Sequence, residues 1–164
     1  MEKYQEAREK SLKCLNIADH MLTMTYPLVR DSKLLVAVME NLFLAQANAL
    51  AAILYWERLY KRIPPFHDNF ESKLNLFRSY IIKKYNVSAG YIGLLQEVKE
   101  LIYEHKQSAI EFSRKNRFVI ASDDYRLKTL SMKQMKDILQ KTKLFIEQIL
   151  TLLEENERSV RKVH

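Results

Sequence analysis

Glycine and proline are scarce in this sequence of 164 residues. The glycines are Gly90 and Gly93, and the prolines are Pro27, Pro64 and Pro65. Glycine supplies the tight turns and left-handed backbone positions that hairpins and phosphate-binding loops need. Two glycines exclude a P-loop and a dinucleotide-binding turn, because both bring bare backbone against phosphate.

Metal ligands and catalytic nucleophiles are equally scarce. Cys14 is the only cysteine, so no intramolecular disulfide and no cysteine-based zinc site can form. A di-iron bundle needs Glu-x-x-His pairs. The residues three positions before the histidines are instead Ile17, Pro64, Ile102 and Arg161. No serine lies in a Gly-x-Ser-x-Gly elbow. We therefore expect no metal, no cofactor and no nucleophilic catalysis.

The remaining composition is typical of a globular protein, and the apolar residues recur at helical spacing. We predict an all-α fold, an antiparallel helical bundle of about five helices, as a single domain over residues 1–157 with a polar C-terminal tail at 158–164. The predicted helices are 2–26, 33–62, 69–85, 88–106, a short one at 108–115, and 132–157. The second is apolar nearly all round, so we expect it at the centre of the core, with Leu44 and Leu50 buried.

Three helix starts carry the spacing of a capping box, a short polar residue followed three positions later by Glu or Gln. They are Asp68 with Glu71, Ser108 with Glu111, and Ser131 with Gln134. A stretch without this pattern, residues 117–130 (RFVIASDDYRLKTL), predicts a short hairpin or extended lobe.

The cellular setting predicted from the sequence is the cytoplasm. The N-terminal MEKYQEAREK alternates in charge and lacks the apolar core of a signal peptide. Residues 34–56 are long enough to span a membrane, yet Glu40, Asn41, Gln46 and Asn48 lie near their middle. We expect a buried core helix and no membrane contact.

The net charge of +7 is concentrated in one segment. Residues 106–136 contain eight basic and three acidic side chains, with aromatic residues among them. Basic groups bind phosphate and aromatic faces stack on bases, so this mixture is typical of an RNA- or nucleotide-binding surface. The candidate site comprises Arg114, Lys115, Arg117, Tyr125, Arg126 and Lys128. The alternative is a solvated basic face.

A second feature is a polar stripe within the long apolar helix. Asn41, Asn48 and Tyr55 lie seven residues apart and so share a helix face. Such a stripe either sets the register of packed helices or of a dimer, or lines a ligand pocket.

The segment Arg62-Ile-Pro-Pro-Phe-His67 has Arg-x4-His spacing. With a compact helical bundle, this resembles the HEPN superfamily (higher eukaryotes and prokaryotes nucleotide-binding). Some members are metal-independent ribonucleases or toxin–antitoxin components that act as dimers. The resemblance implies that Arg62 and His67 would act on the scissile phosphate. The sequence departs from the motif, because Ile63 and two prolines follow the arginine in place of a polar residue.

Three stretches, residues 18–29, 55–70 and 105–120, also resemble small archaeal helical proteins. That resemblance implies a fold and names no activity. We therefore predict a non-enzymatic binding protein, a homodimer, with an anionic partner, RNA or a nucleotide. The alternatives are a HEPN-like ribonuclease and a purely structural assembly module.

Overall fold

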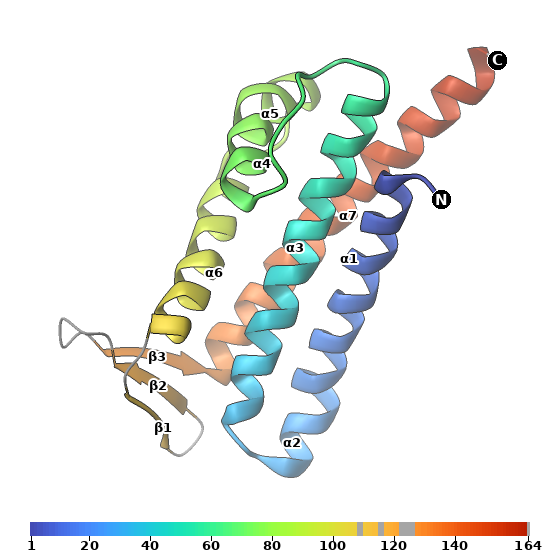
Figure 1. The fold of residues 1–164 in the computed structure, drawn as a ribbon. Helices are drawn as coiled ribbons and strands as arrows, with labels where there is room; N and C mark the ends of the chain where they lie inside the picture. Colours follow the sequence, from blue (N-terminus) through green and yellow to red (C-terminus); the bar gives the residue numbers. More distant parts are fainter. Residues whose placement is uncertain (108–109, 115–116, 122–126, 164) are drawn as a thin grey trace.

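The structure, a computed structural model, describes residues 1–107, 110–114, 117–121 and 127–163. It confirms the all-α helical bundle with a small sheet at one end (Figure 1). The helices are α1 (Lys3–His20), α2 (Tyr26–Val29), α3 (Lys33–Leu59), α4 (Phe70–Leu76), α5 (Ile82–Tyr85), α6 (Gly90–Gln107) and α7 (Met132–Val163). Two π-helical segments, Met21–Thr25 and Phe77–Ile81, join α1 to α2 and α4 to α5. The strands are β1 (Ile110–Arg114), β2 (Arg117–Ala121) and β3 (Leu127–Ser131).

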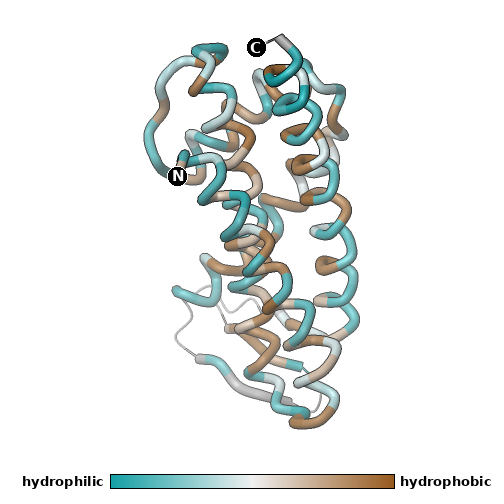
Figure 2. Tube along the Cα trace, turned by 90° about the vertical axis from the view of Figure 1, so that its right-hand side faces the viewer, coloured by the Kyte–Doolittle hydropathy of each residue, from teal (hydrophilic) through white to brown (hydrophobic). Residues whose placement is uncertain are grey.

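The central helix α3 organises the core. It packs against α1, α4, α6 and α7, with α7 behind it in the view of Figure 1. Leu50 and Trp56 are among its buried side chains, as expected for an apolar helix. Leu44 is 46% exposed, so the prediction of its burial was wrong. Leu44 lies on the face of α3 that its neighbours leave open. Hydrophobic and hydrophilic residues alternate along the helices of the bundle (Figure 2).

Among the described residues, α3 is the one helix that is long and apolar enough to cross a membrane, judged by length and composition alone. The core helix of a soluble protein satisfies the same criteria. Here the helix carries Glu57 fully buried within the bundle, and Gln46 donates a hydrogen bond of 2.7 Å to Thr142 of α7. Ser11 of α1 similarly donates to the Ala45 carbonyl oxygen at 2.8 Å. These buried polar contacts define the register of α3 against α1 and α7.

The first helix was predicted to end at residue 26, directly before Pro27, and the structure differs there. Pro27 does not end the first helix, because a π-helical segment precedes it and the chain continues helically to Val29. Arg30, Lys61 and Asn86 adopt the left-handed conformation just after α2, α3 and α5, with φ of 53°, 56° and 53°. Glycine usually occupies this position.

Of the predicted capping boxes, the one at Ser131 is confirmed, the one at Asp68 is wrong, and Ser108 of the remaining one lies outside the described residues. Ser131 accepts a hydrogen bond from the Gln134 backbone N–H at 3.1 Å, which confirms the start of α7. Asp68 was a wrong prediction: Asn69 caps α4 by accepting from the Ser72 N–H at 2.8 Å. The helix α7 also continues through most of the predicted tail, to Val163.

The predicted short helix at 108–115 is wrong, because residues Ile110–Arg114 form strand β1. They alternate in polarity (IEFSR), and β1 pairs antiparallel with β2, Phe112 opposite Val119. A helix of so few residues is unstable alone, so a pairing partner decides the outcome. The predicted hairpin is confirmed: β2 pairs antiparallel with β3 in the order β1-β2-β3. Phe118, Ile120 and Leu130 anchor the sheet in the core.

Candidate functional site

The strand register brings part of the predicted basic cluster together. Arg114, the last residue of β1, lies opposite Arg117, the first residue of β2. Arg117 is exposed, and it also pairs with Ser131, directly before α7. Lys133 is exposed in the first turn of α7. One end of the sheet therefore combines basic residues from β1, β2 and α7, while Lys115 falls outside the described residues.

Lys128 lies toward the other end of the sheet. Lys128 of β3 lies opposite Ile120, one position from the end at which Ala121 pairs with Leu127. Tyr125 and Arg126 precede β3 in the sequence and lie outside the described residues. Three residue steps, the separation along β2 between Arg117 and the Ile120 that pairs with Lys128, span about 10 Å. Among the described residues, Arg114 and Arg117 therefore lie at one end of the sheet and Lys128 lies toward the other, so the two ends need separate tests.

The Arg62 side chain has partners other than those of the catalytic role that the HEPN resemblance implies. It lies 3.7 Å from the Glu57 carboxylate and donates to the Asn156 side-chain oxygen at 3.5 Å. His67 is exposed in the segment before α4. Among the described residues, no hydrogen bond or ion pair joins Arg62 to His67. Arg62 is thus part of a contact between α3 and α7.

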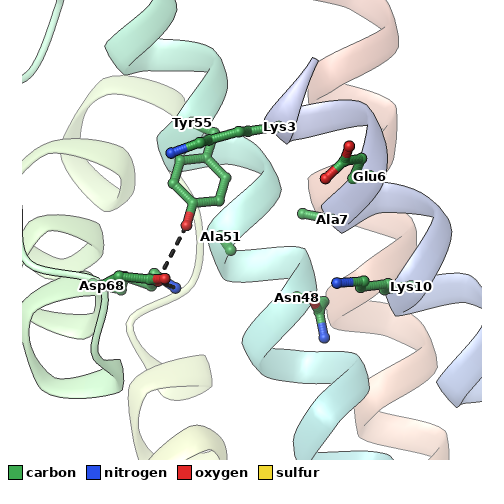
Figure 3. Close-up of a pocket in the computed structure, with 9 residues that line it drawn as sticks. Lys3, Glu6, Ala7, Lys10, Asn48, Ala51, Tyr55 and Asp68 are labelled. Atoms are coloured by element: carbon green, nitrogen blue, oxygen red, sulfur yellow. Dashed lines mark hydrogen bonds and ion pairs between the residues drawn. The ribbon is translucent and has the colours of Figure 1, made fainter. Parts of the chain in front are cut away.

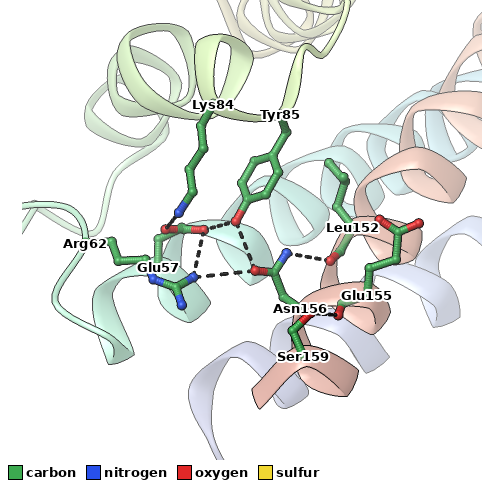
Figure 4. Close-up of polar contacts among 8 residues, drawn as sticks. All are labelled: Glu57, Arg62, Lys84, Tyr85, Leu152, Glu155, Asn156 and Ser159. Carbon is green, nitrogen blue, oxygen red and sulfur yellow. Dashed lines mark hydrogen bonds and ion pairs between the residues drawn. The ribbon is translucent and has the colours of Figure 1, made fainter. Parts of the chain in front are cut away.

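That contact belongs to a polar network around Glu57 (Figure 4). The Glu57 side chain is only 1% exposed, and Lys84 approaches it to 2.8 Å. The Tyr85 hydroxyl donates to Glu57 and approaches Asn156 of α7 at 3.2 Å. Burial, followed by the hydrogen bond and charge of Glu57, raises the pKa of Tyr85 well above 10.0. The network joins α3, α5 and α7 and fixes the end of the bundle.

The polar stripe of α3 lies on its open face. Asn41 and Asn48 each donate to a carbonyl oxygen of their own helix, those of Ala37 at 2.9 Å and Leu44 at 2.8 Å. Asn48 and Tyr55 also line a pocket of about 300 Å³, together with Lys3, Glu6, Ala7, Lys10, Ala51, Asp68 and Lys73 (Figure 3). The pocket interpretation therefore applies to Asn48 and Tyr55. Asn41 lies outside this lining.

The Tyr55 side chain, which forms one wall of the pocket, is contacted by several residues. Its ring stacks on Phe66, with centroids 5.7 Å apart, and its hydroxyl donates to Asp68 at 3.1 Å. The ammonium groups of Lys3 and Lys73 lie 5.6 Å and 5.4 Å from the ring centroid. The hydrogen bond and charge of Lys73, with smaller effects of Tyr55 and Lys3, lower the pKa of the Asp68 carboxyl. Asp68 is thus ionised and already occupied by two donors.

Metal binding and thiol chemistry find little support among the described residues. No group of three His, Cys, Asp or Glu side chains there could hold a metal ion. Cys14 is half-buried, and burial raises the pKa of its thiol, which lowers the reactive thiolate fraction. Comparison of the chain with protein-family models, curated proteins and solved structures finds no match.

Proposed function

We propose that this chain is a non-enzymatic binding protein for an anionic partner, RNA, and that the Arg114–Arg117 end of the sheet contacts it. The observation that carries the proposal is the strand register, which pairs these two arginines. Lys133 adds a third basic residue close to the same end. The anchored core face of β2 supports this basic end on a packed element.

The partner is argued from electrostatics. A cluster of basic side chains neutralises phosphates and releases counterions, so binding to a polyanion weakens steeply with salt. Phosphates along a strand can contact both arginines at once, whereas a single small anion engages fewer basic groups. RNA offers this repeated charge together with bases for aromatic contacts.

The test is fluorescence polarisation with labelled single-stranded RNA at low and moderate salt. We expect salt-sensitive binding that the Arg114→Glu/Arg117→Glu variant weakens at least about tenfold. Lys13→Glu/Lys83→Glu is the matched control, because both lysines are exposed elsewhere and the change in net charge is equal. The variant Arg126→Glu/Lys128→Glu tests two further residues of the predicted cluster, of which Lys128 belongs to β3. Equal loss in the control, or no salt-sensitive binding by the wild type, would refute the proposal.

The homodimer is part of this proposal. Apolar side chains remain exposed around α2, among them Met24, Leu28 and Val29, at 58%, 87% and 60%. Exposed apolar groups of this kind often mark an interface between chains. Light scattering at micromolar concentration should give twice the mass of one chain, and the mass of a single chain would exclude the dimer.

A further inference from the structure

The pocket beside Tyr55 is lined by two lysines of α1, Lys3 and Lys10, and the charge of Lys3 also contributes to the lowered pKa of Asp68. Several exposed lysines form ion pairs, such as Lys141 with Asp137 and Lys143 with Asp19, each at 3.0 Å. Lys3 and Lys10 form no ion pair with a described residue, although both line the pocket. Their side chains project into the pocket from one face of α1, seven residues or about two turns apart.

The hollow exists because small residues face each other across the helix pair. Ala7 of α1 and Ala51 of α3 are almost fully buried and line its floor. Larger side chains at these positions would fill the space. The volume of about 300 Å³ lies at the lower end of the range for small-molecule sites. The pocket therefore suits a small ligand.

The polar groups around this floor are suited to an anion. In Figure 3, the Lys3 side chain crosses the Tyr55 ring and the Lys10 side chain points toward Asn48. The Asn48 amide donates one hydrogen to the Leu44 carbonyl, which leaves its second N–H and its oxygen available. Asp68 is neutralised by Lys73. The Glu6 carboxylate also lines the pocket, between the turns of α1 that carry Lys3 and Lys10 (Figure 3), and forms no ion pair with a described residue.

We propose that this pocket binds a small phosphate ester, with the phosphate between Lys3 and Lys10 and the organic part over Ala7 and Ala51. Lysine binds phosphate as a point charge, and its flexible four-carbon stem lets two residues on one helix converge on a single group. A doubly charged phosphate satisfies both ammonium groups, whereas a carboxylate satisfies one. The site lies at the opposite end of the bundle from the sheet (Figure 1) and is separate from the proposed RNA contact.

The test is isothermal titration calorimetry at low ionic strength with ribose 5-phosphate, inorganic phosphate and ribose. We expect saturable binding of ribose 5-phosphate, weaker binding of inorganic phosphate and none of ribose. The Lys3→Gln/Lys10→Gln variant should lose at least about tenfold in affinity. The exposed Lys13 and Lys83 give the control Lys13→Gln/Lys83→Gln, which should bind as the wild type does.

A second pair of variants tests the pocket without removing a lysine. Asn48→Asp places a carboxylate beside Lys10 and should weaken ribose 5-phosphate binding at least about tenfold. Asn41→Asp is its matched control. Asn41 lies seven residues before Asn48 on the same face of α3, donates the same kind of hydrogen bond to its own helix and does not line the pocket. Circular dichroism checks that all variants fold. Absence of binding by the wild type at millimolar ligand, or equal loss in Asn48→Asp and Asn41→Asp, would overturn the proposal.

Discussion

The Tyr85 hydroxyl donates a hydrogen bond to Glu57, a carboxylate buried at the C-terminal end of the central helix (Figure 4). Lys84, the residue before Tyr85, contacts the other carboxylate oxygen at 2.8 Å. Arg62 approaches from the segment after α3 at 3.7 Å. A buried carboxylate is tolerated only where cations and donors replace water. Glu57 therefore attaches α5 and the end of α3 to one another.

The first prediction concerns the cations around Glu57. Removing both in Lys84→Ala/Arg62→Ala leaves a buried charge with Tyr85 as its main partner. We expect a loss of roughly 2–3 kcal/mol in the free energy of unfolding, less than for a fully buried pair because both cations are partly exposed. Adding Glu57→Gln should restore much of this loss, since the uncompensated charge is gone. Urea unfolding of the three variants measures it, and no recovery in the triple variant would contradict this account.

The second prediction is a pH dependence that arises from Tyr85. Its folded pKa is raised above the ordinary value of 10.0, so the unfolded chain releases this proton first as pH rises. The contribution of Tyr85 is fully present below pH 10 and is lost progressively above it. Tyr85→Phe should therefore make the alkaline decline in stability less steep. Tyr103→Phe, which changes a side chain that is 61% exposed, is the control. Identical alkaline slopes in wild type and Tyr85→Phe would exclude this role.

Much of the fold could be predicted because its signals are local or long. The apolar run of α3 is too long to be anything but a core or membrane helix. The start of α7 could be predicted because the capping Ser131 and its partner Gln134 are three residues apart in the sequence. The strand β1 could not be predicted, because its hydrogen bonds depend on β2. The Ser108–Glu111 spacing indicated a helix there, yet Glu111 contacts His105 at 2.7 Å. Contacts with other parts of the chain therefore determine that Ile110–Arg114 form a strand.

The candidate sites show the same limit. The seven-residue spacing of Asn48 and Tyr55 was visible in one helix, and both line the pocket. Lys3, Lys10 and Lys73 come from other helices and meet them only after folding. The basic segment was visible as charge, but strand register separates Lys128 from Arg114. Sequence spacing predicts which residues share a face of one element and cannot predict which elements meet.

The third prediction compares two leucines of α3. Leu50 is fully buried, whereas Leu44 is 46% exposed. Leu50→Ala should lower the free energy of unfolding by about 2–5 kcal/mol, because it leaves a cavity. Leu44→Ala should change it by less than about 1 kcal/mol. Leu50→Asp should abolish soluble expression, and Leu44→Asp should not. Equal losses at the two positions, measured by urea unfolding, would show that Leu44 is covered in solution.

The last prediction is that Arg62 and His67 do not cleave RNA. General acid–base chemistry on a phosphodiester needs both groups within about 3 Å of the reacting oxygens, on a rigid support. Arg62 is instead engaged by Glu57 and Asn156 and lies 5.2 Å from the centre of the Tyr60 ring. Pro64 and Pro65 separate it from His67, which is exposed.

Labelled RNA incubated with the protein in the presence of a chelator should therefore remain intact, as it should with Arg62→Ala/His67→Ala. Thermal unfolding gives a readout independent of activity. Arg62→Ala should lower the melting temperature by weakening the Glu57 network, and His67→Ala should leave it unchanged, because His67 is exposed and joins no part of that network. Metal-independent cleavage by the wild type that disappears in the double variant would instead establish the HEPN-like ribonuclease interpretation, with Arg62 released from Glu57 when RNA binds.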